Sequence, residues 1–170
     1  MIIKIIKILF IVILSFIVLS VISLLSFKVI FSQKKIESFE INDVNFDRHI
    51  LIASQGSKFK VQLVKDIIDV LNDEKVYIKI IDVSLLNTIN YTDWESIIII
   101  NAIERSKHAE SVDQFIKRNN SGNKIILVAT SGSGNFKVKG YNIDAISTAS
   151  RMKNIDNIKN LVIDKINSVL

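Results

Sequence analysis

Short apolar runs that alternate with segments of helical periodicity restrict the fold of this chain more than any other feature of its sequence. The runs carry hydrophobic side chains on both faces, as in strands that are covered on both sides. They occupy residues 49–53, 76–83, 97–100 and 125–129, with a short fifth run at 143–146. Apolar residues at helical spacing occur at 58–71, around 112–116 and at 155–170. The alternation predicts an α/β domain with a parallel sheet of four or five strands in a three-layer sandwich.

A separate apolar segment lies near the N-terminus. Ile8 to Phe27 gives 20 consecutive residues without a charge, about 30 Å as a helix. A cleaved signal peptide would have a shorter apolar core that ends in a small-x-small cleavage site. Here the apolar run is longer, and residues 23–28 contain no such site. We therefore expect an uncleaved transmembrane anchor with its flanks at 1–33, a linker at 34–48 and one domain at 49–170. The predicted localisation is the cell membrane, with a single pass. The lysines on the two sides of the apolar run are balanced and leave the orientation open, while the short N-terminal tail with two lysines favours a domain outside the cytoplasm.

The net charge of +5 comes from the segment around the apolar run. Five lysines precede residue 36, and the rest of the chain has 17 basic and 17 acidic residues. The domain is therefore neutral, and we expect no nucleic-acid partner. The absence of cysteine excludes thiolate nucleophiles, disulfides and cysteine-ligated metals, and His49 and His108 alone predict no metal site.

The loops that follow the apolar runs are the expected places for a ligand, because ligands of parallel sheets bind outside the carboxyl ends of the strands. The first loop, residues 54–58, enters a helix whose free N–H groups favour a phosphate. An ordinary turn, in which Ser54 or Ser57 only caps the helix, is the alternative. The loop after the fourth run contains Gly132 and Gly134, which allow a close backbone approach to a ring or a phosphate.

The first loop resembles that of the flavodoxin-like family, in which a T/S-x-T-G-x-T stretch surrounds the phosphate of FMN. Gly56 matches strictly, whereas Ala53, Gln55 and Lys58 replace hydroxyl residues. The resemblance implies a flavodoxin-like sandwich with FMN as cofactor. The cofactor contacts that it implies are Ser54, Gln55, Gly56, Ser57, Lys58, Ala102, Ile103, Thr130, Ser131, Gly132, Ser133 and Gly134.

Three smaller resemblances concern other loops. Residues 94–116 are similar to flavodoxin-type protoporphyrinogen oxidases, where Arg105 and His108 would correspond to an Arg and a His of the third loop, although no activity is carried over. Phe136 and Tyr141 are candidates for the aromatic pair that sandwiches a flavin. Residues 144–150 resemble the signal by which exported FMN-binding domains receive FMN on a hydroxyl, here that of Ser150; a loop that caps the last helix is the plainer alternative.

Two functions follow from these features. The first is a membrane-anchored flavodoxin-like redox module, a flavin-dependent oxidoreductase or electron carrier. Its partners would be the lipid bilayer and a membrane redox protein or a quinone. The second is a flavin-free interaction or scaffolding domain tethered to the membrane, which the three missing hydroxyls favour.

Overall fold

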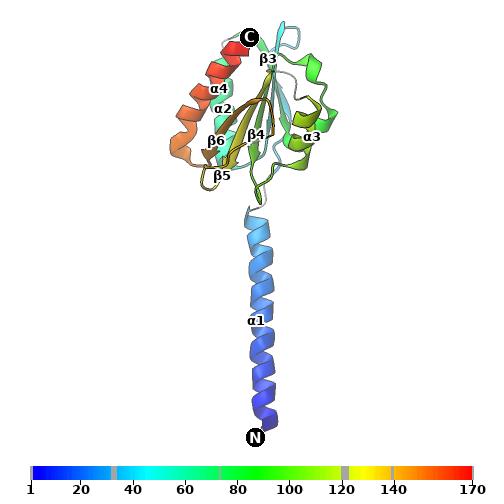
Figure 1. The fold of residues 1–170 in the computed structure, drawn as a ribbon, viewed down its shortest axis with the longest axis vertical. Helices are drawn as coiled ribbons and strands as arrows, with labels where there is room; N and C mark the ends of the chain where they lie inside the picture. The colour runs from blue at the N-terminus through cyan, green and yellow to red at the C-terminus, as the bar shows by residue number, and fades with distance from the viewer. Residues whose placement is uncertain (1, 32–33, 73, 120–122, 139, 170) are drawn as a thin grey trace. The chain divides into compact units, whose positions relative to one another are not determined.

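The computed structural model describes residues 2–31, 34–72, 74–119, 123–138 and 140–169, and the chain divides into two compact units, 1–33 and 34–170. Unit 1 contains the helix α1 (Ile2–Phe31), drawn in blue in Figure 1. Its sequence has neither glycine nor proline, so nothing in it interrupts the helical hydrogen bonds.

The predicted transmembrane helix needs correction. Across the described residues, no helix is both long and apolar enough to cross a membrane. This finding contradicts the transmembrane anchor and the cell-membrane localisation expected from the sequence.

Unit 2 is built around a sheet of six strands in its described residues, in the order β1-β3-β2-β4-β5-β6. Five strands are parallel, and β1 is antiparallel to its neighbour β3. The strands are β1 (Phe39–Ile41), β2 (Arg48–Ser54), β3 (Val76–Asp82), β4 (Ser96–Ala102), β5 (Ile125–Ser131) and β6 (Asp144–Ala149). The α/β class with a mainly parallel sheet agrees with the prediction, whereas β1, within the predicted linker, was not expected.

The five parallel strands follow the order 2-1-3-4-5 when they are numbered along the chain. This is the order of doubly wound sheets of the flavodoxin type. The direction of winding reverses between β2 and β4, which lie side by side. A ligand of such a sheet binds beyond the carboxyl ends of these two strands.

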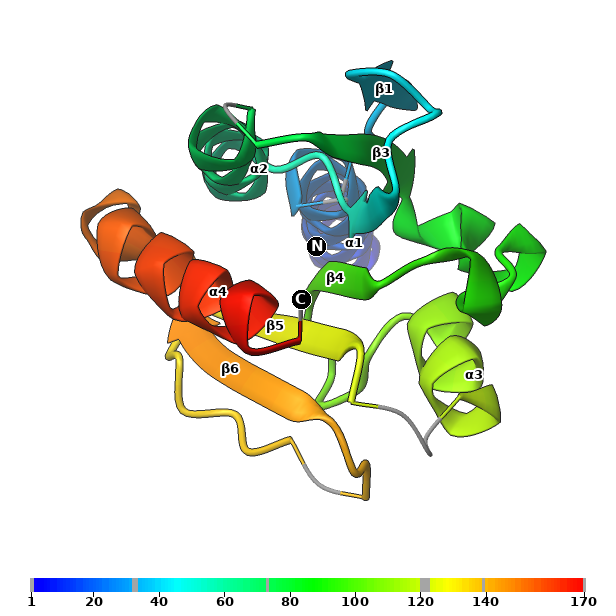
Figure 2. The same ribbon diagram turned by 90° about the horizontal axis from the view of Figure 1, so that it is seen from above.

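Helices cover both faces of the sheet, as Figure 2 shows. One face packs against α2 (Lys58–Leu71) and α4 (Ile155–Val169), and the other against α3 (Glu110–Arg118) and the 3-10 helix η1 (Val83–Thr88). Neighbouring residues of β2 divide between the two cores, with Ile50 in the α2–α4 core and Leu51 in the α3 core. Both side chains are fully buried, and each burial contributes about 1.5–3 kcal/mol relative to an exposed position.

The connections on the α3 side contain little helix. Between β3 and β4 the chain forms η1 and a second 3-10 helix, η2 (Tyr91–Asp93). Between β5 and β6, the described residues 132–138 and 140–143 form no helix, and Val138, Tyr141 and Ile143 pack directly on the α3 core. A short 3-10 helix, η3 (Met152–Asn154), then leads into α4.

Candidate functional site

The carboxyl ends of the parallel strands bring the predicted site residues to one edge of the sheet. Ser54 pairs with Ile100 of β4, Ala102 pairs with Thr130 of β5, and Ser131 lies opposite Ala149 of β6. Loops distant in sequence are therefore neighbours at this edge. The loop after β2 and the loop after β4 flank the point where the strand order reverses.

The first loop is tied down by its own polar side chains. The Ser57 hydroxyl caps α2 by accepting a hydrogen bond from the Lys60 amide at 3.4 Å. The buried Ser54 hydroxyl donates to the Gln55 carbonyl. The Gln55 side chain accepts a 2.7 Å hydrogen bond from the backbone N–H of Ala102, so it bridges the ends of β2 and β4. Lys58 is exposed.

A buried lysine that was not predicted lies directly behind this loop. Lys60, in the first turn of α2, is only 1% exposed, and its ammonium lies 3.4 Å from the Ser57 hydroxyl. Burial lowers the pKa of Lys60 to about 8, while the nearby Glu104 opposes the shift. A signal was present in the sequence, because Lys60 stands at helical spacing with the buried Leu63, Val64 and Ile67. Its charge favours an anion at the loop.

The chain itself lies over the first loop. Residues 34–36, here called the strap, cross it, and the Gly56 N–H donates to the Lys34 carbonyl at 2.6 Å. The Ile36 N–H donates to the Asp82 carboxylate at the end of β3, at 3.1 Å. A Cβ on Gly56 would lie 2.8 Å from the Lys35 carbonyl oxygen and 2.9 Å from that of Lys34. Only glycine allows this close approach of two backbones.

The loop after β4 contains a strained turn. Glu104 and Lys107 exchange two backbone hydrogen bonds of 3.0 Å, and between them Arg105 and Ser106 have φ values of 50° and 62°. Two successive residues at positive φ define a type I′ turn, in which Asn-Gly is preferred. Arg and Ser pay roughly 1–2 kcal/mol each for this conformation. Strain of this kind clusters at functional sites.

The loop after β5 is also held by serine hydroxyls. The Gly134 N–H donates to the Ser131 hydroxyl at 2.9 Å, and the Asn135 N–H to that of Ser133. Gly134 has a φ of 77° and lies against the end of β6. Gly132 is exposed and has open space around it.

Ser150, the candidate for covalent flavin attachment, is exposed at the same edge. Its backbone N–H donates to the Ser131 carbonyl at 3.3 Å. The nearby Asn154 side chain donates to the Ala149 carbonyl at 3.2 Å. The segment thus joins β6 to η3, and the role of its hydroxyl stays a prediction.

A pocket of about 750 Å³ opens beside this edge, between α3, the β4–α3 loop and the side chains of Phe136, Lys137 and Tyr141. His108 lies on its wall, with its Nδ1 3.0 Å from the Asn101 side-chain amide. The rings of Phe136 and Tyr141 approach the imidazole edge-on, with centroids at 5.6 and 5.7 Å. The two candidate aromatic residues therefore pack around His108. Arg105 is not among the residues that line the pocket.

A hydrogen bond and an ion pair link three side chains along one wall of the pocket. The Tyr141 hydroxyl donates to Asp113, whose other oxygen is 2.7 Å from the Lys117 ammonium. The hydrogen bond from Lys117, aided by that from Tyr141, lowers the pKa of Asp113. Burial and the hydrogen bond to Asp113 raise the pKa of Tyr141 to about 12. Burial lowers the pKa of His108, against the attraction of Asp113.

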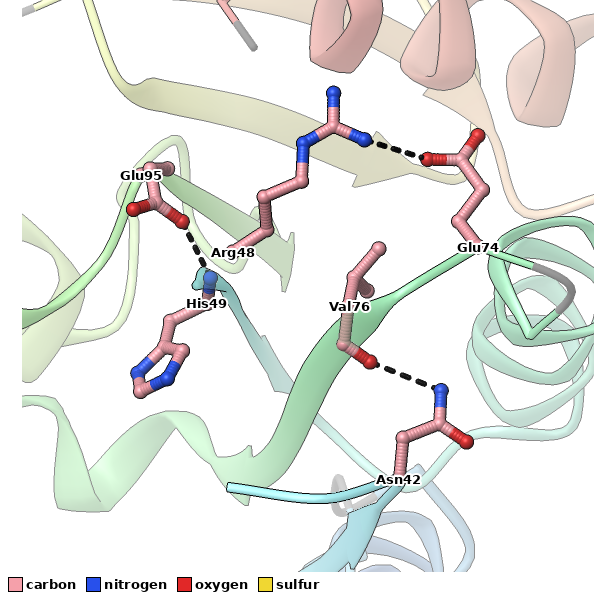
Figure 3. Close-up of polar contacts among 6 residues, drawn as sticks. All are labelled: Asn42, Arg48, His49, Glu74, Val76 and Glu95. Atoms are coloured by element: carbon pink, nitrogen blue, oxygen red, sulfur yellow. Dashed lines mark hydrogen bonds and ion pairs between the residues drawn. The ribbon is translucent and has the colours of Figure 1, made fainter. Parts of the chain in front are cut away.

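The opposite edge of the sheet carries the polar contacts drawn in Figure 3. Arg48 and Glu74 form an ion pair of 3.2 Å, and the Asn42 side chain donates to the Val76 carbonyl at 2.9 Å. The Glu95 carboxylate accepts from the His49 N–H. These residues lie at or before the amino ends of β2, β3 and β4, so they join strands and helices away from the edge where ligands bind.

No family model matches this chain, and neither does any curated protein. Two solved structures are similar to it in part. General stress protein 14 of Treponema denticola, crystallised in complex with FMN, has a TM-score of 0.45 at 7% identity, over 72% of this chain and 99% of that one. An NADPH-quinone reductase from P. pentosaceus has a TM-score of 0.39 at 13% identity, over 72% and 97%. Since both TM-scores lie below 0.5, neither similarity carries an argument about the activity of this chain.

Proposed function

We propose that unit 2 is a flavodoxin-type redox domain that binds FMN beyond the carboxyl ends of β2 and β4. The observation that carries the proposal is the strand order, which reverses between these two strands. Ligands of doubly wound sheets bind at the reversal point, and in flavodoxin, whose sheet has this order, the ligand there is FMN. Strand order is an analogy of fold, and function depends on the chemistry of the loops at the site.

The first loop offers groups suited to a phosphate. The N-terminus of α2 presents a positive dipole, and Ser54 and Ser57 bring hydroxyls to the same turn. The buried ammonium of Lys60 lies behind Ser57 and adds a full charge with little screening by water. These residues would hold the phosphate, whereas the predicted contacts at Gly132 and Gly134 would face the ring.

The bound FMN would accept and release electrons, and the residues of this chain would bind it, orient it and limit the access of water. Ala102, the last residue of β4, and Ile103, which follows it, are half-buried and offer an apolar border on the far side of the reversal point. The proposed electron-transfer partner is a redox protein or a quinone.

A flavin-free interaction domain is the second candidate. Two contacts favour it. The Gln55 side chain bridges the ends of β2 and β4 by accepting a hydrogen bond from the Ala102 N–H, and the Lys34 carbonyl of the strap accepts a hydrogen bond from the Gly56 N–H. If both contacts were permanent, the phosphate would have no place in the first loop.

Titration of the full-length chain with FMN distinguishes the two candidates. We expect quenching of flavin fluorescence, a yellow protein and release of unmodified FMN on acid precipitation. Lys60→Met should weaken FMN binding more than riboflavin binding, because only FMN carries the phosphate. Lys65→Met, at an exposed position on the same helix, is the matched control. Unquenched flavin with the wild-type chain and with variants that release the strap would favour the interaction domain.

A further inference from the structure

The strap holds the first loop through a small number of contacts. Lys34 accepts from the Gly56 N–H at 2.6 Å, and the Ile36 N–H donates to Asp82 at 3.1 Å. The half-buried Ile36 packs against the α2–α4 core, whereas the side chains of Lys34 and Lys35 are exposed. The strap has no regular secondary structure. Segments with so few buried contacts open at a low free-energy cost compared with strands and helices.

The strap takes up the space that a phosphate would need. Its Lys34 carbonyl oxygen accepts from the same Gly56 N–H that a phosphate oxygen would use in the proposed site. Carbonyl oxygens of the strap lie only 2.8 and 2.9 Å from the position of a Cβ on Gly56. No second acceptor fits between the strap and the loop while these contacts are made.

We propose that the strap is an intramolecular competitor that closes the phosphate loop and has to leave Gly56 before FMN binds. This inference rests on the proposed function. FMN then binds only the open form, and the apparent affinity is the intrinsic affinity multiplied by the fraction of molecules in which the strap is open. The contacts of Lys34 and Gln55 that favour a flavin-free domain become, in this scheme, properties of the closed form.

Asp82 is the positioning residue that holds the strap closed. One carboxylate oxygen accepts from Ile36, and the other accepts from the N–H and hydroxyl of Ser84 in η1, at 2.9 and 2.6 Å. Asp82→Asn retains an oxygen for Ser84 and turns an N–H group toward the Ile36 N–H, so it opposes strap closure. Ser84→Ala removes a hydrogen bond to the other oxygen and leaves the contact with the strap in place.

The experiment measures FMN affinity and tryptic cleavage after Lys34 and Lys35 in the full-length chain. We expect Asp82→Asn to bind FMN about tenfold more tightly than the wild type, equivalent to about 1.4 kcal/mol. Ile36→Ala, which removes the apolar contact without touching Asp82, should change affinity in the same direction. Ser84→Ala should bind like the wild type. Saturating FMN should accelerate cleavage after Lys34 and Lys35 in the wild type, because binding expels the strap.

Two results would overturn the inference, and they have different meanings. If the wild type and both strap variants bind FMN equally, and FMN leaves the cleavage rate unchanged, the strap does not compete, although the proposed function stands. If the strap variants are cleaved faster and yet none of the proteins binds FMN, the proposed function fails, and the inference fails with it.

Discussion

Replacement of Gly134 by alanine should destabilise unit 2 strongly, in contrast to the same change at Gly132. Gly134 has a φ of 77°, a conformation that costs an alanine roughly 1–2 kcal/mol. A Cβ at this position would lie 2.6 Å from the backbone nitrogen of Ala149, so the end of β6 would have to move. Overpacking of this kind costs about 1–3 kcal/mol. We therefore expect Gly134→Ala to lower the free energy of unfolding by about 2–5 kcal/mol.

Gly132→Ala is the matched control, because a Cβ there meets nothing within 4 Å. Its effect should stay within about 0.5 kcal/mol. Urea unfolding can be followed through Trp94, which is the only tryptophan in the chain and is 8% exposed. The midpoint for Gly134→Ala should fall by about 1 M or more, with an unchanged slope. Equal midpoints for the two variants would show that the loop relaxes freely, and the reasoning from its backbone conformation would be refuted.

Two further predictions concern ionisable groups. Because burial lowers the pKa of Lys60 from 10.5 to about 8, the unfolded state binds more protons between these values. The free energy of unfolding should therefore rise with pH across this window, by up to about 3 kcal/mol. Urea unfolding at a series of pH values should show this rise in the wild type and not in Lys60→Met. Tyr141→Phe removes the hydrogen bond to Asp113 and should cost about 1 kcal/mol in thermal or urea unfolding. Tyr91→Phe should be neutral, since the Tyr91 hydroxyl is buried without a partner among the described residues, and an equal loss in both variants would contradict the role of Asp113.

Most regular elements could be predicted because their signals are local. The helix expected at 58–71 coincides with α2, where Ser57 supplies the cap and apolar residues recur at helical spacing. The strand expected at 125–129 extends to Ser131, because Thr130 and Ser131 continue to pair with β6. Polar residues at strand ends carry no apolar signal, so the predicted runs stop short of the carboxyl ends of β2, β4, β5 and β6.

The strand β1 was missed for the opposite reason. Phe39, Glu40 and Ile41 lie in a polar, mixed-charge segment, and their strand conformation depends on pairing with β3, far along the chain. Three residues are too few to show an alternation that the sequence alone would reveal.

The place of the candidate site in the fold could be predicted from the sequence, whereas the contacts within it could not. The carboxyl-end rule placed the loops after β2, β4 and β5 at one edge, as the strand register bears out. The Lys34–Gly56 contact joins segments with no shared local pattern, so it left no trace in the sequence. The packing of Phe136 and Tyr141 on His108 likewise depends on a connection between β5 and β6 whose described residues form no helix.

The short strand β1 also bears on how this chain behaves among copies of itself. β3 is buried along nearly its whole length, and within the part of the chain that the structure describes its outer side pairs with β1 alone. An open strand of this kind is a template for edge-to-edge aggregation. β1 covers it, and the ion pair between the exposed Glu40 and the half-buried Lys79, 2.8 Å apart, places charges where another strand would have to dock. A chain shortened beyond Ile41 would lose this cover and, with it, much of its resistance to intermolecular strand pairing.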